Sequence, residues 1–263
     1  MVDFELNDEQ RLFRQTLREF VDSEIVPVAS EWERTGRYPT EIVERFRQLG
    51  LFGMTIPEEY GGLALDRVSF ALVFEEIARG WMGVAGVLGS HSLAAWMIAQ
   101  HGTEEQKKTY LPDLATGARR TGIALTEPGA GTDLQGIQTR AVRDGDHYVV
   151  NGTKTWITNA RHADPMPVLV KTSVTEPAHR GMSLLLVEAG TPATPSAATC
   201  PSSATREPRP ARSRWRTCGC RWRTCSAGPR AGECSRPCPP WNSAGSTSPP
   251  APSASPSAPT TPR

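Results

Sequence analysis

The stretch ALTEPGAGTD, residues 124–133, decides how this chain of 263 residues is interpreted. It begins as a strand and runs into a turn that carries two glycines and the hydroxyls of Thr126 and Thr132. The backbone N–H groups of such a turn can bind an anion such as a pyrophosphate. An ordinary Gly-Ala-Gly loop that binds nothing would have the same composition. On physical grounds, an anion-binding turn and an ordinary loop therefore both stay open.

A second stretch, NGTKTWITNA at residues 151–160, contains a tryptophan and a threonine two positions apart. In a strand, Trp156 and Thr158 would share one face, opposite Ile157. An aromatic plane beside a hydroxyl suits a flat heteroaromatic ring. The competing interpretation is a tryptophan packed against neighbouring helices, and burial preferences alone favour it.

Upstream of both stretches, apolar residues recur at helical spacing. Asn7 with Gln10, and Thr103 with Gln106, fit capping boxes, and Thr40 fits an N-cap. Pro27 should kink the first helix because it lacks an N–H group. The pattern predicts helices over residues 7–34, 40–49, 67–79, 84–100 and 103–115.

Downstream, the apolar period changes to that of strands. Asp144-Gly145 and Asn151-Gly152 predict hairpin turns. Helices followed by strands favour an α+β fold of two segregated parts, with a boundary near residues 116–120. The predicted strands span residues 121–125, 141–143, 147–150, 155–157, 168–171 and 183–187.

The last part of the chain has a different composition. After Val187 there is no Leu, Ile, Val, Phe, Met or Tyr, and this part holds 15 of the 23 prolines and all six cysteines. Such a segment cannot bury enough apolar surface to offset chain entropy. We therefore expect residues beyond about 192 to lack stable packing.

Charge and hydropathy exclude several classes of protein. The net charge of +1 argues against a polybasic nucleic-acid binder, although the part after Val187 carries +7 and the part before it −6. No apolar run approaches membrane-spanning length, so we predict no membrane span. The N-terminus has no basic start followed by an apolar run, which favours a cytoplasmic location over secretion.

Few titratable residues stand out as chemical groups. His91 and His101 lack a metal-ligand spacing, and the cysteines after residue 200 form no paired CxxC motif, so we predict no metal site. Glu127, next to a proline, is interpreted as a loop organiser rather than a general base. Glu75 and Glu76 are expected on a helix surface.

Four stretches together resemble the acyl-CoA dehydrogenase family. ALTEPGAGTD resembles that family's signature at the flavin and substrate site, and NGTKTWITNA its second flavin-contacting strand. LGLFGMTIPEEYGG and HGTEEQKKTYLPDLATG resemble its N-terminal helical domain. The resemblance covers about residues 3–191. It implies a helical domain over 1–118, an incomplete, β-barrel-like middle domain over 119–191, and a disordered tail over 192–263.

The resemblance also implies FAD as cofactor. By this resemblance, Leu125 and Thr126 meet the pyrimidine side of the flavin ring, and Trp156 to Thr158 contact the ring. Thr132 would reach the flavin phosphates and the CoA part of the substrate. The cofactor-binding candidates are Ile123, Ala124, Leu125, Thr126, Gly129, Gly131, Thr132, Trp156, Ile157 and Thr158, and Thr132 is also the substrate-binding candidate.

The reaction implied by the resemblance is the α,β-dehydrogenation of an acyl-CoA to an enoyl-CoA, with an electron-transferring flavoprotein as acceptor. Family members are typically homotetramers or homodimers. In the family, a C-terminal helical bundle supplies the catalytic glutamate, so we assign no catalytic residue here. The alternatives are an acyl-CoA oxidase, a flavin monooxygenase, or a flavin- or CoA-binding fragment without catalysis.

The tail itself permits a further interpretation. Read one base out of frame, residues 215–228 allow the string EDVRVPVEDLLGG, and residues 241–248 allow EFGRINI. Both resemble the family near the start of its helical bundle. We expect a frameshift near residues 191–193 to have replaced the bundle.

Overall fold

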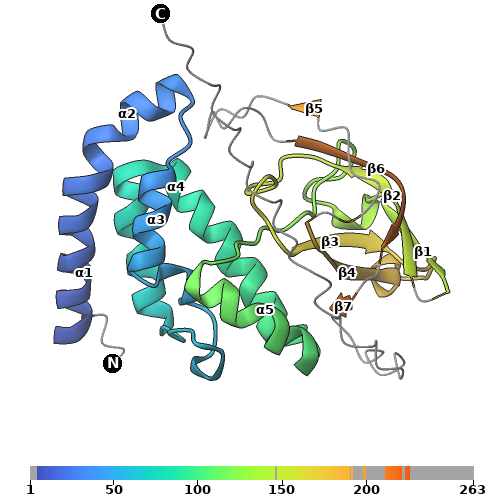
Figure 1. Ribbon diagram of the computed structural model, residues 1–263, viewed down its shortest axis with the longest axis horizontal. Coiled ribbons are helices and arrows are strands. Elements are labelled where there is room, and N and C mark those ends of the chain that lie inside the picture. Colours follow the sequence, from blue (N-terminus) through green and yellow to red (C-terminus); the bar gives the residue numbers. More distant parts are fainter. Residues whose placement is uncertain are drawn as a thin grey trace, which may run out of the picture. The chain divides into compact units, whose positions relative to one another are not determined.

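The computed structural model describes residues 5–145, 147–189, 191, 198–199, 211–220 and 223–225. The chain divides into the units Met1–Ala231 and Gly232–Arg263, and every described residue belongs to the first. Within that unit, helices form the first part and a sheet the second (Figure 1). The expected α+β order of helices followed by strands is therefore confirmed.

The first helical segment has its irregular turn before Pro27 rather than at it. Helix α1 (Asp8–Phe20) is followed by a π-helical turn, η1 (Val21–Ile25), and by α2 (Val26–Thr35). Pro27 occupies the first turn of α2, where a missing N–H costs little. The π turn ends two residues before Pro27, so the irregularity predicted at the proline takes the form of a π bulge.

Two predicted caps of α1 and α5 (Glu104–Thr116) are confirmed. Asn7 accepts from the N–H of Gln10 at 2.7 Å, and the Gln10 side chain accepts from the N–H of Asn7. Thr103 and Gln106 make the same reciprocal pair. Helix α3 (Thr40–Gln48) differs, because Thr40 is its first helical residue and no side chain caps it. Two short 3₁₀ turns, η2 (Leu51–Gly53) and η3 (Glu58–Tyr60), follow α3.

The two helices predicted over 67–79 and 84–100 form one long element, α4 (Arg67–His101). The predicted break survives as a kink at Trp81, where φ is −161° and ψ is 105°. Gly80 does not end the helix. A Cβ atom at Gly80 would lie 2.5 Å from a methyl of Val21, so the glycine permits the close approach of α4 to η1.

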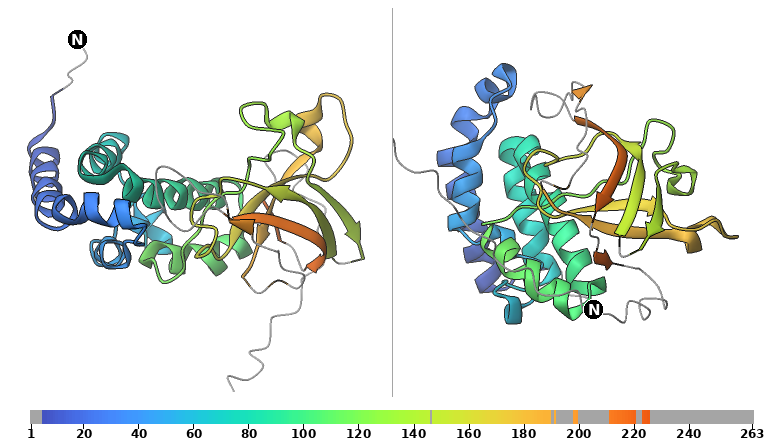
Figure 2. Two further views of the ribbon diagram at one scale, coloured as in Figure 1. Left: turned by 90° about the horizontal axis from the view of Figure 1, so that it is seen from above. Right: turned by 45° about the vertical axis from the view of Figure 1, so that its right-hand side comes forward.

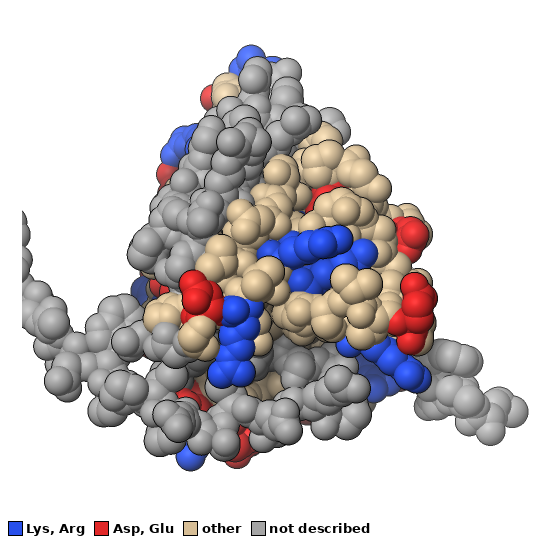
Figure 3. All heavy atoms as spheres, turned by 90° about the vertical axis from the view of Figure 1, so that its right-hand side faces the viewer, with Lys and Arg blue, Asp and Glu red and all other residues tan. Residues whose placement is uncertain are grey.

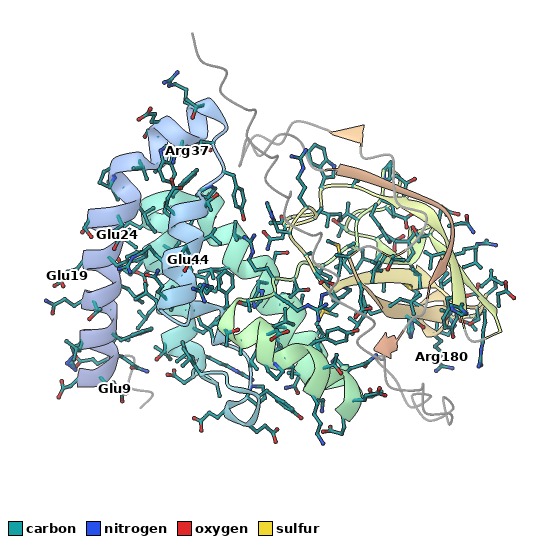
Figure 4. The ribbon with its side chains drawn as sticks, viewed as in Figure 1. Glu9, Glu19, Glu24, Arg37, Glu44 and Arg180 are labelled. Atoms are coloured by element: carbon teal, nitrogen blue, oxygen red, sulfur yellow. The ribbon has the colours of Figure 1, made fainter. Side chains whose placement is uncertain are left out.

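Helix α4 is the core helix of the helical part (Figure 2). Its length and apolar composition would also suffice to cross a membrane, but 61% of that apolar window is buried within the protein. One face packs on α1, η1 and α3 around Phe46 and Ile77, and its C-terminal half packs on α5. Exposed acidic side chains such as Glu9 and Glu19 project from the outer side of α1 (Figure 4).

The β part is a mixed sheet. Its described strands lie in the order β5-β6-β2-β1-β3-β4-β7, and the only parallel pair among them is β1 with β3. Its core holds Ala141, Val150, Val168 and Leu185. The strands are β1 (Arg140–Asp144), β2 (His147–Lys154), β3 (Met166–Lys171), β4 (Met182–Val187), β5 (Ala198–Thr199), β6 (Ala211–Cys220) and β7 (Arg223–Cys225), and the 3₁₀ turns η4 (Leu134–Gly136) and η5 (Ala178–Gly181) lie in the connections.

Several strand predictions need correction. The Asp144-Gly145 turn joins β1 to β2 as expected, but Asn151-Gly152 lies inside β2 and forms no hairpin. A Cβ atom at Gly152 would lie 2.1 Å from Thr139 Oγ1, so this glycine allows a close backbone approach beside an irregularity in the β2–β6 pairing. The expected strands over 121–125 and 155–157 are loop segments, and Trp156 in the second has a positive φ.

Three strands fall inside the tail that was expected to lack stable packing. Strand β6 pairs with β2 from Tyr148 to Lys154, and β7 pairs with β4. Main-chain pairing of this kind does not need aliphatic side chains, which is why the composition did not predict it. Residues 192–197, 200–210, 221–222 and 226–263 lie outside the described residues, and the expectation for them stays a prediction.

Candidate functional site

The two motif stretches lie side by side. The N–H of Thr155, directly after β2, donates to the carbonyl of Thr126, near the start of the first stretch, at 2.9 Å. The ammonium of Lys154 donates to the carbonyl of Leu125 at 2.8 Å. These contacts hold the start of the Gly-rich turn against the end of β2.

The residues just before the first stretch are joined to the end of the second. The Asn159 side chain donates to the carbonyls of Thr121 and Val87, at 3.2 and 2.9 Å. A Cβ atom at Gly122 would lie 2.5 Å from the carbonyl oxygen of Thr158, so only glycine allows this approach. Residues 121–126 and 154–159 therefore run antiparallel, with helix α4 behind them.

Glu127 organises the turn, as the sequence suggested. Its buried carboxylate accepts from the N–H of Gln138 at 2.6 Å and from the N–H of Thr139 at 3.0 Å. It also accepts from the Thr139 hydroxyl and from the Lys154 ammonium, the latter at 2.9 Å. The N–H and carbonyl groups of Glu127 pair with those of Ala130 across the turn. All of these donors come from residues of the chain itself.

Electrostatics follow from these contacts. Burial alone would raise the pKa of Glu127, but the hydrogen bonds from Thr139, Gln138 and Lys154 outweigh it and hold that pKa below its ordinary value. Burial lowers the pKa of Lys154, and the neighbouring carboxylate opposes that change. A carboxylate whose pKa is lowered and whose oxygens already accept four hydrogen bonds is a poor proton acceptor, so Glu127 does not suit the role of general base.

The open side of this arrangement carries the aromatic residue. Trp156 is 54% exposed and has a φ of 60°, a left-handed conformation that is rare for a bulky residue. Thr158 is exposed too, while Ile157 is buried in the core of the sheet. The interpretation of Trp156 as a core residue is therefore wrong. The alternation holds even though the segment is not a strand.

The Gly-rich turn also has uncovered space and, in the part of the chain that the structure describes, N–H groups without an acceptor. A Cβ atom at Gly129 or at Gly131 would meet nothing within 4 Å, and neither glycine has a positive φ. Within the described residues, the N–H groups of Gly131 and Thr132 donate no hydrogen bond. Thr132 is exposed. The turn therefore offers a ligand two N–H donors, those of Gly131 and Thr132, and open space beside the two glycines.

The remaining candidates differ in what they can offer. Ala124 lies in the core, where its N–H and carbonyl pair with β3, and its side chain cannot reach a ligand. The buried side chain of Ile157 is limited in the same way. Ile123, Leu125 and Thr126 are half-buried at the edge of the turn.

Sequence reasoning missed Lys154 and Thr139. Both belong to the buried polar cluster around Glu127. The only sequence indication was a lysine at an otherwise strand-like position next to Trp156. A charged residue there is rarely buried unless it has a partner, and the partner lies 27 residues upstream.

Glu76 also departs from expectation. Instead of lying on a helix surface, its side chain is completely buried and accepts from Arg14, Arg18 and Arg79. These arginines outweigh the effect of burial and lower the pKa of Glu76 to about 2. Glu75 does lie on the surface. The cluster joins α1 to α4 and lies far along the chain from the Gly-rich turn.

Other kinds of site are not supported in the described part of the chain. No group of three or more His, Cys, Asp or Glu residues there could hold a metal ion. On the face shown in Figure 3, basic and acidic side chains are interspersed with uncharged surface.

Comparison with known proteins matches both parts of the chain. Residues 7–118 match the acyl-CoA dehydrogenase N-terminal domain, and residues 122–207 match the acyl-CoA dehydrogenase middle domain. The chain belongs to the acyl-CoA dehydrogenase family. The middle-domain match extends past residue 191, where the resemblance in sequence was expected to stop.

Individual family members agree with this assignment. A short-chain-specific acyl-CoA dehydrogenase of Clostridium acetobutylicum is 43% identical over 192 residues, which cover 72% of this chain and 50% of that protein. An acyl-CoA dehydrogenase structure from Geobacillus kaustophilus aligns with a TM-score of 0.77 at 36% identity, covering 86% of this chain and 60% of that one. A glutaryl-CoA dehydrogenase from Mycobacterium smegmatis, solved in complex with FADH2, aligns with a TM-score of 0.74 at 29% identity, covering 85% and 56%. The chain thus spans about half the length of such relatives.

Proposed function

We propose that this chain binds FAD on the open side of the two paired stretches and belongs to an enzyme that dehydrogenates acyl-CoA thioesters to enoyl-CoA. The observation that carries the proposal is the antiparallel pairing of residues 121–126 with 154–159, which leaves both Trp156 and Thr158 exposed. The family assignment supplies the class of cofactor and substrate.

The residues present fit a flavin. The exposed indole of Trp156 offers a flat apolar surface, and the exposed Thr158 two residues further along offers a hydroxyl. Glycines 129 and 131 leave the turn uncovered, and the N–H groups of Gly131 and Thr132 are available to phosphate oxygens. Leu125 and Thr126 would lie at the edge of the ring.

The reaction divides between cofactor and protein. When bound, FAD accepts the hydride from the β-carbon of the acyl group. The chain's own residues bind and orient the ring through Trp156 and Thr158 and hold the phosphate-bearing part at the Gly-rich turn. Glu127 is committed to that turn, and we assign no residue here to removal of the α-proton. Acyl-CoA as substrate, an electron-transferring flavoprotein as acceptor and a cytoplasmic location belong to the proposal.

The direct test is flavin binding by the purified chain. FAD is titrated into apoprotein, and quenching of flavin fluorescence and the visible absorption spectrum are followed. Saturable binding that is weakened by Trp156→Ala supports the proposed site. Absence of binding under conditions in which the chain is folded would overturn it.

Addition of acyl-CoA then separates catalysis from binding alone. Bleaching of the bound flavin under anaerobic conditions by one of a series of acyl-CoAs of increasing length supports dehydrogenation by this chain. Binding without bleaching favours the alternative of a flavin-binding chain that is not catalytic by itself. A chain that spans about half of its relatives' length makes that alternative a specific competitor.

A further inference from the structure

A buried ion pair lies directly beneath the proposed flavin site. The side chain of Lys154 is completely buried, that of Glu127 is 5% exposed, and their charged atoms are 2.9 Å apart. Taking two charges out of water is costly, and a well-packed apolar pair of similar volume is often as stable or more stable. Stability of the fold alone is therefore a weak reason for this pair.

What the pair does is fix one peptide group. Lys154 Nζ donates to the carbonyl of Leu125, while Glu127 holds Lys154 in place. The carbonyl and the N–H of one trans peptide point in opposite directions. When the Leu125 carbonyl points inward to Lys154, the N–H of Thr126 in the same peptide must point away from the buried pair.

The carbonyl groups on either side of Leu125 also accept hydrogen bonds. Those of Ala124 and Thr126 accept from the N–H groups of Leu169 and Thr155. The N–H of Thr126, in contrast, donates no hydrogen bond within the described residues. A run of fixed carbonyls and one outward N–H is a preorganised donor at the edge of the turn.

We propose that Lys154 and Glu127 are positioning residues, which hold the Leu125–Thr126 peptide so that its N–H donates to the bound flavin ring. The inference rests on the proposed function for the identity of the ligand. The orientation of the peptide itself rests on the contacts above. The pair acts through Thr126 and touches neither cofactor nor substrate.

The test replaces both charges at once, because removing one would leave the other buried without its partner. The double variant Glu127→Gln, Lys154→Met keeps the volume of both side chains, and glutamine retains an oxygen that can accept from the N–H of Thr139. The matched control is Glu76→Gln, which removes a buried carboxylate from the cluster between α1 and α4. Folding of all three proteins is checked by circular dichroism and thermal unfolding.

Two measurements follow on the full chain. Hydrogen–deuterium exchange without FAD should be faster in residues 123–132 of the double variant than in the parent, and unchanged there in Glu76→Gln. Fluorescence titration should show FAD binding weakened roughly tenfold in the double variant, the expected effect of misplacing one well-oriented donor. The absorption band of the flavin that still binds should shift, because the hydrogen bond to the ring is lost.

The outcomes are distinguishable. Unchanged exchange in residues 123–132 overturns the inference whether or not FAD binds. Equal FAD affinity and an unchanged flavin spectrum in a folded double variant overturn it as well, while leaving the proposed function intact. If the parent itself binds no FAD, the proposed function fails, and the exchange measurement alone decides whether the pair holds this peptide.

Discussion

The Nδ1 atom of His91 accepts a hydrogen bond from the main-chain N–H of Thr121 at 3.2 Å, while its Nε2 atom lies 3.1 Å from the carbonyl of Phe52. A ring that accepts at Nδ1 and donates at Nε2 is neutral and has one fixed tautomer. His91 thus joins α4 and η2 to the first residue of the segment that leads into the Gly-rich turn. The ring is completely buried. His91, to which the sequence assigned no role, therefore has a structural one.

This contact predicts a pH-dependent stability. Burial lowers the pKa of His91 from 6.5 to about 4, so the unfolded chain takes up a proton at a higher pH than the folded chain does. The stabilising contribution is complete above about pH 6.5 and is lost as pH falls towards about 4. Between these values, urea unfolding should show the free energy of unfolding falling by about 1.4 kcal/mol per pH unit from this group.

His91→Gln provides the control for that prediction. Glutamine offers one donor and one acceptor but does not titrate, so its stability should depend less steeply on pH over the same interval. Parallel pH profiles for parent and variant would show that His91 does not cause the effect.

Replacement of Glu76 by glutamine should lower the free energy of unfolding by about 2 kcal/mol, because charge-assisted hydrogen bonds to a buried carboxylate are lost. Glu75→Gln is the matched control. Its single ion pair with Arg14 is exposed and should contribute less than about 1 kcal/mol. Denaturant unfolding at neutral pH measures both variants, and equal effects would contradict the special role of the buried carboxylate.

The contribution of the Glu76 carboxylate to the stability of the fold should itself depend on pH. Because the pKa of Glu76 is lowered to about 2, its contribution is present above about pH 4.5 and is lost as pH falls towards about 2. The difference in stability between parent and Glu76→Gln should therefore shrink over this interval. A difference that stays constant down to about pH 2 would exclude the predicted titration.

Trp156 should show opposite effects on stability and on flavin binding. Trp156→Gly relieves a left-handed backbone conformation that costs on the order of 1–3 kcal/mol, which offsets the burial lost from a side chain that is 54% exposed. The variant should melt at the same or a higher temperature than the parent. It should bind FAD more weakly, since a stacked aromatic contributes about 0.5–1.5 kcal/mol beyond its burial.

A tryptophan elsewhere on the surface gives the comparison. Trp96 on α4 is 44% exposed, and Trp96→Ala should leave the affinity for FAD unchanged. An unchanged affinity in Trp156→Gly would instead remove Trp156 from the proposed site.

The glycines of the site should divide into two classes. Gly122→Ala places a methyl group 2.5 Å from the Thr158 carbonyl and should destabilise the fold by about 1–3 kcal/mol. Gly131→Ala meets no neighbouring atom and should fold as well as the parent. Its methyl group would, however, cover part of the open turn, so weaker FAD binding with unchanged thermal stability is expected. Equal melting temperatures for both variants would contradict the packing at Gly122.

Much of the fold was predictable because it depends on residues close together in the sequence. The capping boxes at Asn7 and Thr103 need only a side chain and an N–H group three residues away, and the structure contains both. The Asp144-Gly145 hairpin is equally local. The two motif stretches were identified from their own residues, and the structure brings them together.

Local sequence pattern was thus enough to predict the helices, the strands β1 to β4 and the two stretches that form the candidate site. The roles of Gly80, Gly152 and Glu76 became visible in the folded chain alone, because each contacts a partner outside its own element of secondary structure or its own turn. The same holds for Lys154, whose partner Glu127 lies 27 residues upstream. Periodicity and propensity record neighbours within a few residues, whereas burial of a charge or the close approach of two backbones depends on which distant segments the folded chain places in contact.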